Sequence, residues 1–258
     1  MIKGLYTSYT GMINEQHRLD TMANNLANAD TNGYKKEGAT AQAFDDVLAW
    51  KIKDVSEAGN LPRRMGNLNL GVKIGENYQD WSEGPFKQTG NTYDLGLSGP
   101  GFFAIEFTSK SGETSTKYTR DGKFGVDAKG NLVTADGDFV LNSSGAHVTI
   151  NPLLPSEINS SGQIIQNGQV VATIGVTDFE DYNYLEKYGE NLWEPVDGAT
   201  EKQAKALVYS GYLEQSNVSV VDEMVNMIAI QRSYEANQKL IQAFDSTLEI
   251  SATQIGRV

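Results

Sequence analysis

The chain has 258 residues, no cysteine and a formal net charge of −12, from 21 basic and 33 acidic residues. The missing cysteines exclude disulfides, thiolate metal sites and cysteine nucleophiles. The acidity argues against nucleic-acid binding and against docking on an anionic membrane, because both depend on positive charge. Hydrophobic residues make up 39% of the chain and charged residues 21%, an ordinary balance for a globular protein.

Proline is confined to the middle of the chain, between Pro62 and Pro195. Because proline breaks helices, both ends are candidates for long helices. We expect the first helix to cover residues 1–33, with Asn32-Gly33 as its stop signal. One apolar stripe in it repeats every seven residues: Leu5, Met12, Leu19 and Leu26. A sustained seven-residue repeat is typical of helices packed as in a coiled coil.

The C-terminal segment 213–258 shows the same period, and we expect it to form the second helix. Ser219 and Asp222 fit a capping box at its start. Its stripe extends over six positions: Val220, Met227, Tyr234, Ile241, Leu248 and Ile255. The two ends of the chain therefore form a candidate helical domain that is discontinuous in sequence.

The middle of the chain has a different pattern. In residues 81–212, short β-branched and aromatic runs alternate with turn pairs such as Asp136-Gly137, Ser144-Gly145 and Asn167-Gly168. Such turns between β-rich runs predict antiparallel hairpins, so we expect an all-β domain. Residues 34–80 have weak periodicity and several Gly and Asn residues, and we expect an extended connector. The predicted fold class is α+β, with the all-β domain inserted into a coiled-coil-like helical domain.

The long helical stripes have two interpretations. Amphipathic helices commonly cover a core of their own molecule. However, a single pair of helices makes a small core that only just offsets the entropy of ordering the chain. We therefore favour helices that associate between molecules, since identical head-to-tail contacts that do not close into a ring produce a helical polymer.

Motifs in three parts of the chain resemble the family of flagellar rod and hook proteins. Residues 23–35, Ala-Asn-Asn-Leu-Ala-Asn-Ala-Asp-Thr-Asn-Gly-Tyr-Lys, are similar to the family's N-terminal signature. Residues 94–103 and 118–124 are similar to its central β domain. Residues 211–218 and 223–237 are similar to its C-terminal helix, and they look most like the distal rod, with the proximal rod paralogue close. Together these motifs extend the resemblance from one end of the chain to the other.

The signature contains three asparagines that helix termination does not explain: Asn24, Asn25 and Asn28. Asparagine is mildly unfavourable inside a helix. We therefore expect these three to make polar contacts to a neighbouring subunit, together with the apolar positions of the two seven-residue stripes.

The resemblance implies a structural subunit of the flagellar rod, with the distal rod favoured over a proximal rod or hook paralogue. By resemblance, subunits polymerise into a hollow drive shaft that transmits torque from motor to hook. The implied partners are other copies, other rod proteins, the hook protein, the type III export apparatus and, around the rod, a bushing ring. Export without a cleaved signal peptide agrees with a start, Met1–Thr7, that lacks a continuous apolar run.

An enzyme is disfavoured by the sequence. The two histidines, His17 and His147, lack neighbouring patterns of a metal site or a catalytic triad. We expect no catalytic residues, no metal, no cofactor, no nucleic acid and no small-molecule substrate. A different class of protein stays open: a stalked β-domain binding module or adhesin, in which tryptophans line a sugar site.

Overall fold

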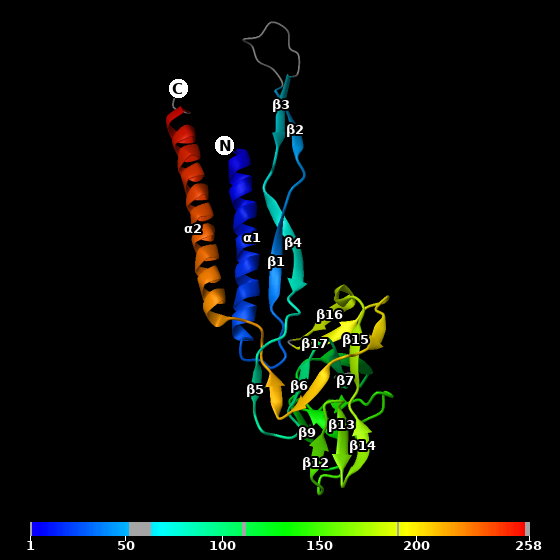
Figure 1. Cartoon of the computed structure of the whole chain (residues 1–258). Coiled ribbons are helices and arrows are strands. Elements are labelled where there is room, and N and C mark those ends of the chain that lie inside the picture. The colour runs from blue at the N-terminus through cyan, green and yellow to red at the C-terminus, as the bar shows by residue number, and fades with distance from the viewer. Residues whose placement is uncertain (1, 52–62, 110–111, 190, 256–258) are drawn as a thin grey trace. The chain divides into compact units, whose positions relative to one another are not determined.

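The computed structural model describes residues 2–51, 63–109, 112–189 and 191–255, apart from the side chains of residues 2, 49–51, 63–65 and 255. The chain divides into two compact units (Figure 1). The helical unit contains Met1–Leu26, Glu37–Asp80 and Val220–Val258, and the β-rich unit contains Ala27–Lys36 and Trp81–Ser219. The division differs from the expected one because residues 27–36 belong with the β-rich unit and residues 37–80 with the helices.

The helical unit is built on α1 (Ile2–Ala27) and α2 (Val220–Ile250), with a π-helical turn, η2 (Ser251–Ile255), after α2. The two helices lie side by side and antiparallel (Figure 1). Three pairs of residues, one from each helix, lie close together and fit one antiparallel register. The amide of Asn25 donates to Glu223 at 3.5 Å, a methyl group at Gly11 would lie 3.1 Å from the Asn237 amide, and one at Gly4 would lie 2.8 Å from the Phe244 ring.

Along α2 the least exposed positions alternate by four and three residues, which defines a narrow seam on one face. The seam consists of Glu223, Met227, Ile230, Tyr234, Asn237, Ile241 and Phe244. On α1 the buried side chains are small or polar: Ser8, Asn14, Thr21 and Asn25. The stripe Leu5, Met12, Leu19 and Leu26 is only half-buried. Small residues on α1 allow α2 to approach closely, which is why Gly4 and Gly11 face side chains of α2.

Residues 37–51 and 63–79 form an antiparallel ribbon where the sequence predicted an extended connector. Strand β1 (Glu37–Ala43) pairs with β4 (Val72–Gln79), and β2 (Val47–Lys51) pairs with β3 (Arg63–Leu68). Hydrogen bonds connect the ribbon to α1, two of them near the middle of the helix. The backbone N–H of Val72 donates to Thr10 Oγ1 at 3.4 Å, and Asn77 Oδ1 lies 3.0 Å from His17 Nε2.

The β-rich unit contains one nine-stranded sheet and several smaller ones. The large sheet runs in the order β16-β17-β8-β7-β11-β10-β9, and β15 pairs with both β7 and β18. Its strands are β7 (Phe102–Thr108), β8 (Thr114–Thr119), β9 (Phe124–Val126), β10 (Leu132–Thr134), β11 (Phe139–Val140), β15 (Val176–Phe179), β16 (Leu185–Tyr188), β17 (Leu192–Pro195) and β18 (Glu201–Gln203).

The smaller sheets complete the unit. Strands β12 (Ser156–Ile158), β13 (Gln163–Gln166) and β14 (Gln169–Thr173) form a three-stranded sheet. Strand β6 (Leu95–Ser98) pairs with β19 (Leu207–Ser210), and β5 (Phe86–Gln88) pairs with β20 (Tyr212–Glu214). A short 3-10 helix, η1 (Tyr182–Tyr184), precedes β16.

Asp136-Gly137, Ser144-Gly145 and Asn167-Gly168 lie in turns of this unit, as the sequence predicted. Asn167 and Gly168 have φ values of 52° and 76° and join β13 to β14. Gly137 and Gly145 also have positive φ, as tight turns require. An aliphatic core and an aromatic core lie inside the unit, the aromatic one around Phe102 and Trp193. The prediction of an α+β fold with helical ends and a β-rich middle is confirmed.

Candidate assembly surface and buried ionic cluster

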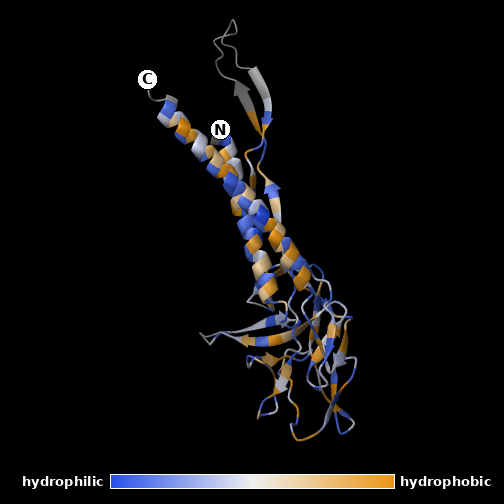
Figure 2. Cartoon of the chain, turned by 90° about the vertical axis from the view of Figure 1, so that its left-hand side faces the viewer, coloured by the Kyte–Doolittle hydropathy of each residue, from blue (hydrophilic) through white to orange (hydrophobic). Residues whose placement is uncertain are grey.

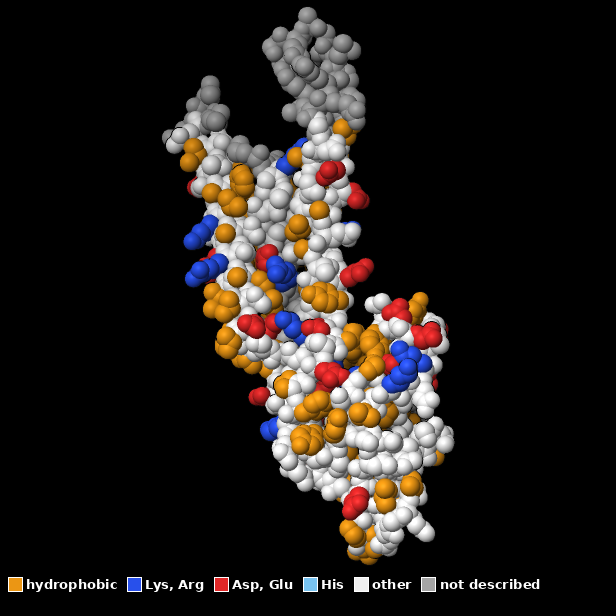
Figure 3. Space-filling view, viewed as in Figure 1, with side chains coloured by type: hydrophobic (Ala, Val, Ile, Leu, Met, Phe, Trp, Pro, Cys, Tyr) orange, Lys and Arg blue, Asp and Glu red, His pale blue; other side chains and the backbone are white. Residues whose placement is uncertain are grey.

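The first two turns of α2 carry an exposed apolar surface, which we call the α2 patch. It consists of Val221, Met224, Val225 and Ile228, exposed by 67%, 44%, 60% and 53%. Spacings of three and four residues place these side chains on one face, away from the seam that faces α1. Figure 3 shows hydrophobic side chains gathered over the start of α2. Exposed apolar side chains grouped on one face make this surface a candidate site of protein contact.

The same face of α2 becomes polar beyond Ile228. Arg232, Glu235 and Lys239 follow on it, and all three are exposed. Figure 2 shows hydrophobic and hydrophilic residues alternating along both helices. On α1 a second exposed apolar face consists of Tyr6, Tyr9 and Ile13, again spaced by three and four residues. Each helix therefore has one face toward its partner helix and one apolar face that the chain leaves exposed.

The predicted interface residues are divided between these faces. Met227, Tyr234 and Ile241 are half-buried in the seam, whereas Val220 and Leu248 are exposed. The side chain of Ile255 lies outside the described residues. Sequence periodicity did not single out the α2 patch itself, because Val221, Val225 and Ile228 do not fall on the seven-residue stripe.

The three signature asparagines have different environments. Asn24 is exposed, Asn28 is half-buried, and Asn25 is fully buried. The side chain of Asn25 accepts from the backbone N–H of Glu37 at 2.9 Å and donates to the Glu37 carbonyl at 2.8 Å. Asn25 thus joins the end of α1 to the start of β1, and its amide is occupied within its own chain. These contacts account for Asn25 in the last turn of α1 without a neighbouring subunit.

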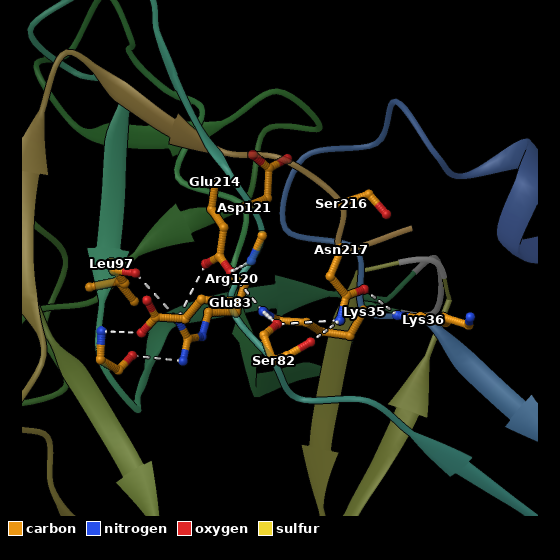
Figure 4. Close-up of polar contacts among 12 residues, drawn as sticks. Lys35, Lys36, Ser82, Glu83, Leu97, Arg120, Asp121, Glu214, Ser216 and Asn217 are labelled. Carbon is orange, nitrogen blue, oxygen red and sulfur yellow. Dashed lines mark hydrogen bonds and ion pairs between the residues drawn. The ribbon is translucent and has the colours of Figure 1, made fainter. Parts of the chain in front are cut away.

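A buried ionic cluster lies within the β-rich unit (Figure 4). The Glu214 carboxylate accepts from Lys35 Nζ at 2.6 Å, from an Arg120 guanidinium nitrogen at 3.2 Å and from the backbone N–H of Gly84 at 3.1 Å. The side chains of Glu214, Lys35 and Arg120 are exposed by 0%, 1% and 4%. Such a cluster is stable only when each charge is paired, because desolvation of a lone ion costs several kcal/mol.

Backbone groups complete the cluster. Lys35 Nζ donates to the Ser82 carbonyl at 2.7 Å, and Arg120 donates to the Gly99 carbonyl at 2.9 Å. Burial lowers the pKa of Lys35, while the Glu214 carboxylate opposes that shift. The contact to Glu214 and the Ser82 carbonyl both favour the ammonium form in this buried site.

Two glycines let the backbone approach the cluster. Gly33 has a φ of +69°, and a methyl group on it would lie 2.4 Å from the backbone nitrogen of Asp121. A methyl group on Gly84 would lie 1.9 Å from the Gln215 carbonyl oxygen. Next to Gly33, Tyr34 is fully buried. The Gly33-Tyr34-Lys35 end of the signature is thus explained by close packing inside one chain.

The sequence analysis identified the motifs that contain Lys35, Arg120 and Glu214, but it did not predict their ion pairing. The same motifs also contain Asp30, Asp121 and Lys123, so charge alone did not single out these three residues. Spacings of about 85 and 94 residues along the chain carry no information on which charges meet. The pairing is visible only once the sheets bring the three segments together.

Near the cluster, the carboxyl group of Asp121 makes the stability of the fold depend on pH. Burial raises the pKa of its carboxyl to about 6 from an ordinary 3.8; the Lys123 backbone N–H and the Lys123 charge oppose the shift, while Asp136 and Asp94 add to it. The folded state therefore holds this proton at pH values where the unfolded chain has lost it. We expect the free energy of unfolding to fall as pH rises from about 4 to about 6 and to level off above that.

This expectation is checked by urea titrations between pH 4 and 7 on the wild type and on Asp121→Asn. The variant removes the titrating group and should show a shallower fall across this window. Asp127→Asn is a control that changes the same charge at an exposed turn. An equal slope in the wild type and Asp121→Asn would contradict the assignment.

The aromatic residues do not form an open sugar site in the described part of the chain. Trp193 is fully buried, and Trp81 packs against it with ring centres 5.5 Å apart. Among the described residues, no group of three or more His, Asp or Glu side chains is arranged to hold a metal ion. No helix of the described residues has the length and hydrophobicity to cross a membrane.

Comparison with known proteins agrees with these motifs. The family model described as flagella basal body rod protein matches residues 5–35. The model described as flagellar hook protein FlgE/F/G D1 domain matches residues 96–172, and flagellar basal body rod FlgEFG protein C-terminal matches residues 209–255.

Three relatives that align over nearly their whole length are named flagellar basal-body rod proteins. The chain is 33% identical to the flagellar basal-body rod protein FlgG of Bacillus subtilis, over 96% of this chain and 97% of that protein. It is 33% identical to the flagellar basal-body rod protein FlgF of Caulobacter vibrioides, over 100% and 98%. It is 31% identical to FlgG of Buchnera aphidicola, over 96% and 98%. The chain therefore belongs to the flagellar basal-body rod protein family, and it is a structural subunit of the rod and not an enzyme.

Proposed function

We propose that subunits assemble through the exposed apolar faces of α1 and α2 into a hollow helical shaft that transmits torque to the hook. The observation that carries this proposal is the α2 patch, where four apolar side chains remain exposed on a helix whose other face is already paired. Burying such side chains contributes about 25 cal/mol per Å². A second copy or another rod protein that covers the patch gains this energy on assembly.

The coiled-coil character of the helical domain is part of the same proposal. The seam of α2 alternates by four and three residues over Glu223–Phe244, as in a coiled coil. Three contacts in one antiparallel register support it. In an assembled shaft the half-buried stripe Leu5, Met12, Leu19 and Leu26 would pack against further helices of neighbouring subunits.

The test introduces a charge into the α2 patch. Val225→Asp should reduce incorporation into basal bodies by about 100-fold or more, because a carboxylate buried without a partner costs about 3 kcal/mol or more. The free subunit should keep its stability, since the side chain is exposed there. Basal bodies are purified and the subunit is quantified by mass spectrometry.

Gln238→Asp is the matched control, because it adds the same charge at an exposed position of the same helix. Wild-type incorporation of Val225→Asp would rule out the α2 patch as an assembly surface. If the free variant were unfolded, its loss from basal bodies would be caused by misfolding and not by a lost contact. The circular dichroism melting curve of each purified variant is therefore measured alongside.

Within the rod we propose the distal segment. This rests on the resemblance of residues 211–218 and 223–237 to distal rod members, while rod proteins of two names match with the same 33% identity. The proximal rod is the second candidate. A gold-labelled tag in an exposed turn of the β-rich unit, such as residues 143–145, distinguishes them: label adjacent to the hook supports the distal rod, and label at the opposite end supports the proximal rod.

We also propose that the subunit leaves the cell through the flagellum's own type III apparatus without a cleaved signal. The other proposed partners are the hook protein, neighbouring rod proteins and a bushing ring around the rod. Mass spectrometry of the subunit from purified basal bodies checks the export route. A peptide that begins within the first two residues supports it, and a processed N-terminus contradicts it.

A further inference from the structure

The chain passes between its two units at four places: after Leu26, after Lys36, after Asp80 and after Ser219. In the β-rich unit, the segments next to these crossings are residues 27–36, those that follow Asp80 and those that precede Ser219. A single set of contacts joins all of them. The backbone N–H of Gly33 donates to the Glu214 carbonyl at 2.9 Å, and the Gln215 N–H donates to the Pro85 carbonyl at 2.9 Å.

Side chains reinforce the same three segments. Lys35 bonds both the Glu214 carboxylate and the Ser82 carbonyl, so one ammonium group contacts all three. Asn217 accepts from the Lys36 N–H at 2.8 Å and donates to Ser82 Oγ at 3.0 Å. Arg120 anchors Glu214 to the core of the unit, beside β6.

A second set of contacts, inside the helical unit, joins the segments of that unit that lead to the crossings. There Asn25 bonds both backbone groups of Glu37 and reaches the Glu223 carboxylate. It joins the end of α1, the start of β1 and the start of α2, which are three of the four crossing segments. Each unit therefore binds together the chain segments that lead to the other.

We propose that Lys35, Arg120, Glu214 and Asn217 form an intramolecular joint. It holds together, at one point of the β-rich unit, the segments through which the chain enters and leaves that unit. Force on the helices therefore reaches the β-rich unit through several chain segments at once. The signature ending in Gly33-Tyr34-Lys35 then stabilises the fold of the subunit, and contact with a neighbour is left to the exposed helix faces. The transmission of torque through this joint rests on the proposed function.

Ionic contacts suit this role because their geometry is specific. Glu214 accepts three hydrogen bonds from three different segments, so a shift of any one segment leaves a buried charge or N–H without its partner. An apolar contact among the same segments would tolerate sliding, since hydrophobic burial is non-directional. The joint thus resists displacement more than an equally stable apolar cluster would.

The test is hydrogen exchange on the full-length free subunit, read at the amides of Gly33, Lys36, Gly84 and Gln215. In Lys35→Met and Glu214→Gln these amides should exchange at least tenfold faster, while those of β7 and β8 keep wild-type rates. Lys87→Met is the matched control, because Lys87 is exposed on β5, the strand that pairs with β20. Asn217→Ala is a milder variant that keeps the measurement informative if a charge variant fails to fold.

The double variant Lys35→Met/Glu214→Gln should exchange no faster than the worse single variant, because the two groups act as one unit. Wild-type exchange rates at all four amides in these variants would overturn the joint. Variants whose free subunits exchange normally but no longer enter the rod would instead assign these residues to a subunit contact. Absence of the wild-type chain from basal bodies is a separate result, which would overturn the proposed function and leave the joint unaffected.

Discussion

Glu214→Ala is expected to lower the free energy of unfolding of the β-rich unit by about 3–5 kcal/mol, because removing one partner of a buried ion pair leaves an uncompensated charge. Here two cations, Lys35 and Arg120, lose the same anion, and the Gly84 N–H loses its acceptor. Urea denaturation followed by tryptophan fluorescence measures the change, since Trp81 and Trp193 both pack in the aromatic core of this unit.

The control is Glu157→Ala, which removes a carboxylate from an exposed position on β12. It should change the free energy of unfolding by no more than about 0.5 kcal/mol. A loss of less than about 1 kcal/mol in Glu214→Ala, comparable to that of a surface ion pair, would show that water reaches the cluster and that the carboxylate is not structurally required.

Gly33→Ala is the second large effect, and we expect a loss of about 3 kcal/mol or more. A non-glycine residue in the left-handed region costs about 1 kcal/mol, and here the new methyl group also meets backbone atoms of Arg120 and Asp121 within 3 Å. Those atoms belong to the segment that anchors the ionic cluster, so they cannot move aside without disturbing it.

Gly145→Ala separates the cost of the left-handed backbone angle from the cost of the steric contact. Gly145 has a similar φ of +78°, but a methyl group there meets nothing within 4 Å. It should lose only about 1 kcal/mol, the cost of the backbone conformation alone. Equal losses in the two variants, measured by urea denaturation, would mean that Gly33 is required for its backbone angle and not for close packing.

Local signals predicted the hairpins of the β-rich unit well. Within residues 81–212, the short runs rich in β-branched and aromatic residues at Phe124–Val126, Leu132–Thr134 and after Asn167-Gly168 form β9, β10 and β14. A glycine or asparagine with positive φ and β-branched neighbours specify a hairpin within a few residues. Nothing distant in the chain has to be known for such an element, which is why sequence sufficed.

The ribbon of β1 to β4 also had a local signal in the sequence, but that signal was weaker. Leu68, Leu70, Val72 and Ile74 alternate with Asn67, Asn69, Gly71 and Lys73, a period of two that predicts a strand. The glycines and asparagines between them favoured an irregular connector. The paired strand, β1, lies about 30 residues earlier and has little apolar alternation of its own, so its pairing was not visible in the sequence.

On the helices, periodicity predicted the elements but only part of their faces. The seven-residue stripes led to Leu5 and Leu19 as contact residues, whereas α1 buries Ser8, Asn14, Thr21 and Asn25 most deeply. A hydrophobic pattern does not reveal a contact made by small and polar side chains. The α2 patch was missed for a related reason, since a helix with two apolar faces has no single periodic stripe.

The ionic cluster was beyond sequence reasoning for a different reason. Lys35, Arg120 and Glu214 are far apart in the chain, and each has several candidate partners among 54 charged residues (21 basic and 33 acidic). Their pairing depends on β20 lying beside β5 and on the loop before β9 lying beside β6. Such contacts follow from tertiary structure and not from local pattern.

Thiol labelling of Val225→Cys tests the central claim most directly, that the α2 patch is covered when the subunit is in the rod. The chain has no cysteine, so the substitution provides a single reporter. Our account predicts fast modification by a maleimide in the free subunit, where Val225 is 60% exposed, and strong protection in intact basal bodies that is lost on denaturation. Equally fast modification in intact basal bodies and in the free subunit would contradict it.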